Sequence, residues 1–138
     1  MANILQVSGA IESPPTLVWI GRGLSGVVVL FLLFDSVIKL LALPIVGETL
    51  SGLGYPASHA RLLGVLTLAP VLLYAFPRTS LLGAILLTGL FGGAMATHLR
   101  VGSPLFSHVL FGLYLGLLTW GGLLLREPRL WTMLPLRT

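Results

Sequence analysis

The sequence predicts an all-α, polytopic membrane protein, an antiparallel bundle of four transmembrane helices. Composition is the first indication: of 138 residues, 56% are hydrophobic and only 9% are charged, whereas a soluble domain carries about 25% charged residues. Four apolar stretches approach or exceed the roughly 20 helical residues that cross a bilayer. Short segments rich in helix breakers separate them, as expected for antiparallel neighbours in one bundle.

The four helices are expected over residues 16–43, 61–76, 79–99 and 104–125. Glycines and prolines in residues 44–58 form the first separator, residues 77–78 the second and residues 100–103 the third. Ser103 and Pro104 are typical of a helix start, with Ser103 as the N-cap and Pro104 at the first helical position.

The whole chain, residues 1–138, is expected to form a single domain with two short tails. The N-terminal tail, residues 1–15, lacks the pattern of a basic segment followed by an apolar run that marks a signal sequence. The C-terminal tail, residues 126–138, contains Trp131, an aromatic residue typical of the membrane interface. We therefore expect this tail to be an interfacial anchor.

The distribution of basic residues predicts the orientation, because Lys and Arg are in excess on the cytoplasmic side. One side of the predicted bundle carries five of them: Arg22, Arg78, Arg126, Arg129 and Arg137. The other carries three: Lys39, Arg61 and Arg100. We expect a multi-pass protein of the cell inner membrane with both termini in the cytoplasm.

Composition also excludes several function classes. The net charge is +4, but the cations are scattered singly at helix ends, so the sequence supports neither a nucleic-acid interface nor a strong anionic-lipid patch. Cysteine is absent, which excludes disulfides, thiolate metal sites, iron–sulfur clusters and a dithiol relay to a quinone.

Asp35 and Lys39 are the most informative pair, since they lie inside the first apolar span. Each costs about 2.5–3.5 kcal/mol at the centre of a membrane helix on insertion scales. Their spacing of i and i+4, with the acid first, places both on one helix face, where they can neutralise each other. The pair therefore predicts a polar site enclosed by protein.

This pair lies toward the C-terminal end of the first predicted helix. Other ionisable residues lie at the start of the second helix, at the end of the third and near the start of the fourth. In an antiparallel bundle these ends face one side, so we expect them to converge in the outer half of the membrane. On helical wheels His108 faces the bundle, whereas His98 and Arg100 lie on opposite faces of the third helix. The predicted set is Asp35, Lys39, Arg61, His98, Arg100 and His108.

Several interpretations of this set remain open. It could be a structural polar network, or Lys39 and Arg100 could extend to the interface without forming a site. It could be a pocket for a quinone, an isoprenoid head group or another small amphiphile. A metal site of Asp35, His98 and His108 has suitable ligands, but Lys39 and Arg100 disfavour a cation there. We assign no metal ligand and no catalytic residue, because no nucleophile is aligned for acid–base chemistry.

Two pairs of glycines are candidates for close helix packing, which requires small residues in lipid. Gly89 and Gly93 lie four residues apart on the third helix, as do Gly112 and Gly116 on the fourth. They are expected to pack helices within the chain, and a homo-oligomer through one of them is the alternative.

Six segments of the chain resemble the DoxX-like family of small bacterial membrane proteins. The resemblance covers roughly residues 20–137. The segments are residues 30–40 (LFLLFDSVIKL), 53–56 (LGYP), 74–79 (YAFPRT), 97–100 (THLR), 104–108 (PLFSH) and 126–130 (REPRL).

The resemblance implies a four-helix membrane protein, but no single activity. The wider group includes a thiosulfate:quinone oxidoreductase subunit, a methylamine-utilisation assembly protein and a neuronal receptor chaperone. It extends distantly to the membrane part of vitamin K-dependent carboxylase. A thiol–quinone relay is not carried over, since this chain has no cysteine.

The leading expectation is an accessory or assembly subunit of a larger membrane complex, with a redox complex as one option. Its partners would be the lipid bilayer and other membrane subunits. The first alternative is a quinone- or lipid-binding protein, with an enzyme as one variant of it, and the second is a chaperone for membrane helices. No cofactor is assigned beyond a bound quinone or lipid.

Overall fold

The computed structural model describes residues 14–133, and all regular structure within that range is helical. Four stretches are long and apolar enough to cross a membrane: Pro15–Leu40, Ala57–Ala75, Ser80–Arg100 and Leu105–Arg126. At a rise of about 1.5 Å per residue, even the shortest approaches the roughly 30 Å of a hydrocarbon core. The predicted all-α fold with four spans is confirmed.

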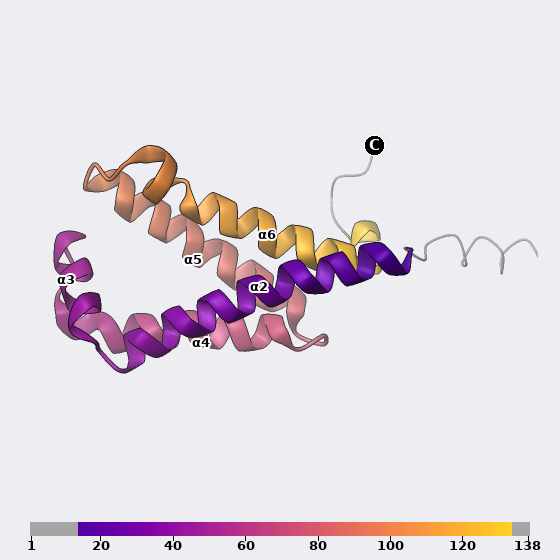
Figure 1. Cartoon of the computed structure of the whole chain (residues 1–138), viewed down its shortest axis with the longest axis horizontal. Helices are drawn as coiled ribbons and strands as arrows, with labels where there is room; N and C mark the ends of the chain where they lie inside the picture. Colours follow the sequence, from indigo (N-terminus) through magenta and orange to yellow (C-terminus); the bar gives the residue numbers. More distant parts are fainter. Residues whose placement is uncertain (1–13, 134–138) are drawn as a thin grey trace, which may run out of the picture.

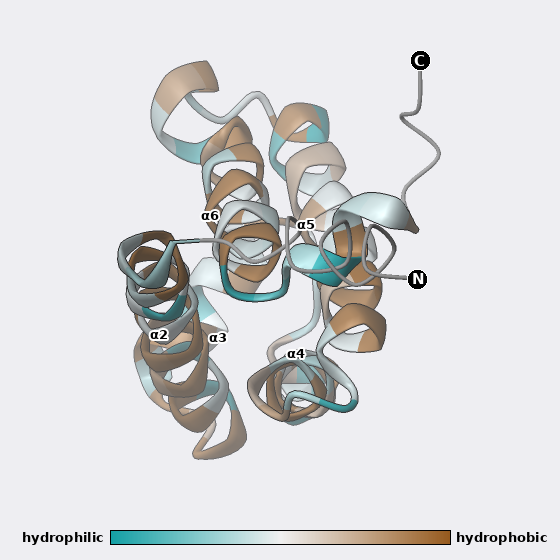
Figure 2. Cartoon of the chain, turned by 90° about the vertical axis from the view of Figure 1, so that its right-hand side faces the viewer, coloured by the Kyte–Doolittle hydropathy of each residue, from teal (hydrophilic) through white to brown (hydrophobic). Residues whose placement is uncertain are grey.

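The spans form a ring in which α2 and α5 each pack against both α4 and α6. Successive spans reverse direction, so neighbours around the ring are antiparallel (Figures 1 and 2). The elements in chain order are α2 (Pro15–Leu40), α3 (Pro44–Gly52), the 3-10 turn η2 (Ala57–His59), α4 (Ala60–Ala75), α5 (Ser80–Arg100), the π-helical turn η3 (Leu105–Val109), α6 (Phe111–Arg126) and the 3-10 turn η4 (Pro128–Thr132).

The helices converge at one end of the molecule and diverge at the other (Figure 1). At the first, which we call the closed end, α2 begins, α4 turns into α5 and α6 ends. At the second, the splayed end, lie α3, η2 and η3. The apolar core contains Tyr74 and Leu87, both 0% exposed. Many large apolar side chains lie on the outside, as expected where lipid is the solvent.

Glycines bring the helix backbones together around this core. A Cβ atom on Gly21 would lie 2.6 Å from the backbone nitrogen of Arg126, and one on Gly122 would lie 2.9 Å from that of Ser25. These two contacts bring α2 against α6. Gly83 packs against the Tyr74 backbone in the same way and joins α5 to α4.

The first span ends earlier than predicted, at Leu40 rather than at residue 43. Pro44 disfavours helical backbone at the preceding residue, and Leu43 is extended. Ala42 turns the chain with a positive φ of 51°. Pro44 then begins α3, although residues 44–58 were expected to contain no helix. Burial explains α3, because its Val46 and Leu50 pack in a small apolar cluster.

The fourth span begins with a π-helical turn, not with the expected Ser103 cap. The Val109 amide donates to the Pro104 carbonyl, and that of Leu110 to the Leu105 carbonyl, both five residues back. Pro104 flanks the turn. The Ser103 hydroxyl is 3.0 Å from His98 Nδ1, so it is engaged away from the helix start.

The C-terminal tail begins as the turn η4, which packs against α6. Trp131 is 57% exposed, and its indole nitrogen donates to the Leu124 carbonyl over 3.2 Å. Arg126 belongs to α6 rather than to the tail. The remainder of the two predicted tails, residues 1–13 and 134–138, lies outside the described residues.

Candidate functional site

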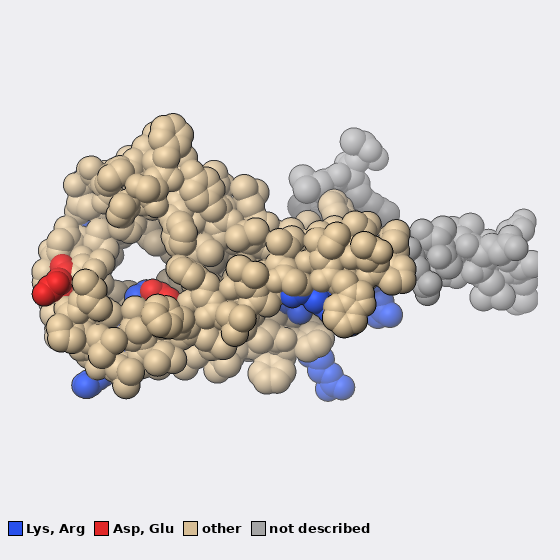
Figure 3. All heavy atoms as spheres, viewed as in Figure 1, with Lys and Arg blue, Asp and Glu red and all other residues tan. Residues whose placement is uncertain are grey.

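The divergence of the helices leaves a cavity of about 570 Å³ at the splayed end. Side chains of all four spans and of α3 line it, and most of them are apolar. In the space-filling view an opening passes through the molecule here, with an acidic and a basic group at its edge (Figure 3). A cavity of this size accommodates a small organic ligand or a lipid head group.

Asp35 and Lys39 form the polar part of one wall. Lys39 Nζ donates to Asp35 Oδ2 over 2.6 Å, and the two side chains are 24% and 27% exposed. Within residues 14–133 this is the only ion pair. The predicted pairing is therefore formed, and both residues line the cavity. The pair carries no net charge, but its ammonium and carboxylate can each bind a polar group.

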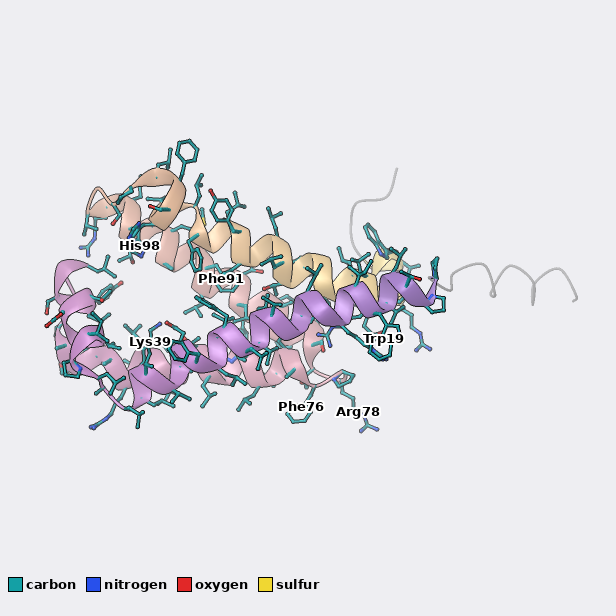
Figure 4. The ribbon with its side chains drawn as sticks, viewed as in Figure 1. Trp19, Lys39, Phe76, Arg78, Phe91 and His98 are labelled. Atoms are coloured by element: carbon teal, nitrogen blue, oxygen red, sulfur yellow. The ribbon has the colours of Figure 1, made fainter. Side chains whose placement is uncertain are left out.

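His98 stands across the cavity from Lys39, with Phe91 deeper between the helices (Figure 4). His98 is partly buried, and its Nδ1 lies 3.0 Å from Ser103 Oγ. Among the described residues its Nε2 has no hydrogen-bond partner, which leaves that nitrogen for a ligand. Helical-wheel geometry places His98 opposite Arg100, and His98 is the one that lines the cavity.

His108 lies beside His98, with the ring centroids 5.7 Å apart in an edge-to-face arrangement. Its Nδ1 is 2.8 Å from Ser107 Oγ. The side chain is exposed and does not line the cavity. The helical wheel predicted that His108 faces the bundle. That prediction assumes a rotation of 100° per residue, and the π-helical turn has a different rotation, so the side chain points elsewhere.

Arg61 and Arg100 do not reach the cavity, although both lie at the splayed end. Arg61 Nε donates to the Leu40 carbonyl over 3.3 Å, and Arg100 Nη2 to the Leu53 carbonyl over 2.8 Å. Arg61 thus binds the last residue of α2, and Arg100 binds the residue that follows α3. The structure places three of the six predicted residues in the cavity wall, one beside it and two outside.

Tyr55 and Thr97 connect the two sides of the splayed end. The Thr97 hydroxyl donates to the Gly93 carbonyl over 2.9 Å, so the Tyr55 hydroxyl donates in the 3.2 Å contact with Thr97. Both residues line the cavity and add polar groups near His98. Sequence reasoning did not identify them, and the only signal was that Tyr55 and Thr97 belong to motifs quoted for the family resemblance.

The four predicted packing glycines divide into two kinds. A Cβ on Gly112 would lie 2.8 Å from the Phe91 carbonyl oxygen, so α6 and α5 approach closely there. Gly116 makes only an ordinary contact, 3.9 Å to the Phe91 ring. Gly89 and Gly93 have no neighbour within 4 Å of such an atom, because they line the cavity instead.

The alternative metal site is not formed. Across residues 14–133 no three His, Cys, Asp or Glu side chains lie close enough to hold a metal ion. Lys39 already occupies the Asp35 carboxylate in an ion pair. The remaining donors suit a ligand with carbonyl or hydroxyl groups better than a cation.

A second polar network, which the sequence did not reveal, lies at the closed end. The Tyr74 hydroxyl donates to the Thr119 carbonyl over 2.7 Å and accepts from Ser25 Oγ over 2.8 Å. Arg126 Nη2 donates to the Tyr74 carbonyl over 3.0 Å and lies 3.2 Å from Ser80 Oγ. The predicted set of six residues contains none of these side chains. The available signals were a tyrosine inside one span and an arginine ending another.

A model of the DoxX-like family matches residues 23–122. These residues include α3, all of α4 and α5, and most of α2 and α6. The match therefore covers the cavity and its lining residues. Neither the curated proteins nor the solved structures give a match.

Proposed function

The chain belongs to the DoxX-like family, and from this premise we propose that it binds a small lipophilic molecule with a polar head group, of the quinone or lipid class. The observation that carries the proposal is the cavity of about 570 Å³, with an apolar lining and polar groups on facing walls. Ligand sites typically have volumes of about 300–1,000 Å³ and combine an apolar lining with a few placed polar groups.

The polar groups favour an uncharged head group. The Asp35–Lys39 pair is neutral as a whole, and His98 Nε2 is available on the other wall. A head group with two separated carbonyl or hydroxyl oxygens could contact both walls at once. A strongly charged head group would instead have to compete with an ion pair already in contact at 2.6 Å.

The apolar groups favour a flat ring. Phe31 and Phe111 meet edge to face, with ring centroids 5.5 Å apart, and both line the cavity. Phe91 lines it as well. Aromatic rings contact one another in stacked or edge-to-face arrangements, so these side chains suit the planar ring of a quinone, while its isoprenoid tail extends along the apolar helices.

Substitutions at two neighbouring glycines of α5 test whether the ligand binds in this cavity. Gly93 lines the cavity and Gly92 does not, and an added Cβ has open space at both positions. We expect Gly93→Leu to fill the cavity and abolish binding of decylubiquinone, with Gly92→Leu binding as the wild type does. Equilibrium partition in detergent measures this. Wild-type affinity in Gly93→Leu would refute the proposed site.

A second pair of variants tests the polar wall. His98→Leu removes the available nitrogen, and we expect about tenfold weaker binding, the equivalent of one hydrogen bond of about 1.4 kcal/mol. His59→Leu is the matched control, since His59 is exposed on η2 and outside the cavity. Equal loss in both variants would mean that His98 does not contact the head group.

Purification of the protein distinguishes this function from that of an accessory or assembly subunit. A ligand-binding protein should yield an extractable quinone or lipid when isolated alone. Suppose instead that a larger membrane protein co-purifies in fixed stoichiometry with both the wild type and Gly93→Leu, and that no ligand can be extracted. This result would favour the role of a subunit. Mass spectrometry of the purified sample measures both.

We also propose that the closed end faces the cytoplasm, with the cavity in the outer half of the inner membrane. Within residues 14–133, Arg22, Arg78, Arg126 and Arg129 lie at the closed end. Lys39, Arg61 and Arg100 lie at the splayed end, and Lys39 is neutralised by Asp35. The excess of basic residues at the closed end, four against three, favours this orientation.

A further inference from the structure

A smaller cavity of about 250 Å³ lies at the closed end, separate from the proposed ligand site. It lies among α2, α4 and α6, and two arginines contribute to its wall. Among the described residues no acidic side chain does. Its lining consists of Arg22, Ser25, Gly26, Val29, Ala75 and Arg126.

Arg126 is held rigidly in this wall. Its Nη2 donates to the Tyr74 carbonyl, and its guanidinium lies 4.9 Å from the centroid of the Tyr74 ring. Its Nε is buried and has no hydrogen-bond partner within residues 14–133. A buried cationic group that lacks an acceptor is costly, so an anion in the cavity that this guanidinium lines would offset its charge.

Arg22 lies beside an exposed tryptophan. Its guanidinium lies 5.0 Å from the ring centroid of Trp19, which is 67% exposed. Exposed tryptophans mark the membrane interface. Phe76, 64% exposed, and Arg78 lie at the same end of the molecule (Figure 4).

The positive charge of this end is not balanced by the described part of the chain. Glu127 follows Arg126, but no Lys or Arg nitrogen in residues 14–133 lies within 4.0 Å of its carboxylate. Among the described residues that are visible in Figure 3, basic groups and no acidic ones lie near the start of α2. Arginine guanidinium groups match the geometry of phosphate oxygens, and often bind two at once.

We propose that Arg22 and Arg126 form a phosphate-binding site at the closed end, which takes the head-group phosphate of an anionic membrane lipid. The phosphate would occupy the smaller cavity and pair with the guanidinium groups of Arg22 and Arg126. The acyl chains would lie along the apolar outside of α2 and α4. A free phosphate ion has the same chemistry, and the experiment separates the two sources.

The test uses the full chain in dodecyl maltoside, a detergent without phosphate. Phosphatidylglycerol is titrated, and the lipid concentration at half of the maximal rise in Tm is measured. Diacylglycerol, with the same acyl chains but no phosphate, is the lipid control. Sodium phosphate, against sodium chloride of equal ionic strength, tests the free ion.

Phosphatidylglycerol should raise the Tm of the wild type, and diacylglycerol should not. Arg22→Gln should raise the half-maximal concentration by about tenfold, the loss of one charge-assisted contact. Arg78→Gln is the matched control, an exposed arginine at the same end that does not line the cavity, and it should behave as the wild type. A rise with sodium phosphate alone at millimolar concentration would identify the free ion as a ligand of the same site.

Two results would overturn the proposal. In the first, diacylglycerol stabilises the protein as well as phosphatidylglycerol does, so that the phosphate contributes nothing. In the second, Arg22→Gln and Arg78→Gln weaken the effect equally, so that diffuse charge and not this pair of arginines attracts the lipid. Both variants change exposed arginines, so the fold should tolerate them.

Discussion

Tyr74 is the largest fully buried side chain in residues 14–133, and it shows how single residues hold the closed end together. Its hydroxyl connects α4 to α2 through Ser25 and to α6 through the Thr119 carbonyl. Its own carbonyl accepts from Arg126 and from Ser80 Oγ. Away from water these groups have no alternative partners, so each must be paired within the protein.

At the residue scale we predict that Tyr74→Phe lowers the free energy of unfolding by about 1–2 kcal/mol, because Ser25 Oγ and the Thr119 carbonyl lose a buried partner. Tyr114→Phe is the control: its hydroxyl also donates to a carbonyl, that of Phe106, but Tyr114 is 41% exposed. Denaturant unfolding in detergent measures both. Equal losses would contradict a special role for the buried hydroxyl.

The helices themselves approach by means of glycine at a few positions. At Gly83 an added Cβ would overlap the Tyr74 backbone and lie 2.8 Å from the Pro70 carbonyl oxygen. The neighbours are backbone atoms, which cannot rotate away as a side chain can. The spacing of α4 and α5 is therefore set by the absence of a side chain at this one position.

At the element scale we predict that Gly83→Ala lowers the free energy of unfolding by about 1–3 kcal/mol, the usual cost of overpacking. Gly121→Ala on α6 has open space around the new atom, and we expect a gain of up to about 1 kcal/mol from helix propensity. The same unfolding assay compares them. A gain in both variants would show that α4 and α5 can separate without cost.

At the scale of the whole molecule, the ring of four helices is tight at one end and open at the other. The closed end has the buried network and the contacts of Gly21, Gly83 and Gly122. The splayed end has α3, which contributes to the cavity wall, and η3, which lies outside the cavity lining. One end therefore provides stability, and the other provides space for a ligand.

We predict that the two ends lie on opposite sides of the membrane, with the closed end in the cytoplasm. The chain has no cysteine, so single introduced cysteines give no background. Ser58→Cys at the splayed end should react with an impermeant maleimide in intact cells. Thr132→Cys at the closed end should react only after lysis. Both positions are exposed. The reverse pattern would refute the proposed orientation.

Local signals predicted much of the fold and one part of the site. The spans were predictable because a bilayer fixes their length and apolar character. Asp35 and Lys39 were predictable as a pair because an i, i+4 spacing brings them together on any helix. Membership of the DoxX-like family was indicated by the sequence motifs, and the family match confirms it.

Predictions that assumed regular α-helical geometry, or that treated proline and glycine only as helix breakers, were wrong. The helical wheel misplaced His108 because η3 is π-helical. The proline and glycine content of residues 44–58 concealed α3, since Pro44 begins a helix there. Gly89 and Gly93 matched a packing pattern, but the same spacing is found where helices diverge and glycine leaves a cavity open.

The sequence by itself determined that the chain has four helices long and apolar enough to cross a membrane, and that one carboxylate and one ammonium neutralise each other within the first of them. These properties follow from the cost of polar groups in hydrocarbon and from neighbours on a single helix. Only the tertiary structure decided that His98 faces this pair across a cavity. It also decided that hydrogen bonds of Tyr74 and Arg126 join their helices, between residues that are 45 and 52 positions apart in the chain. Such contacts depend on how far the helices diverge and how each one is rotated. Packing between helices sets both, and no local pattern of residues encodes them.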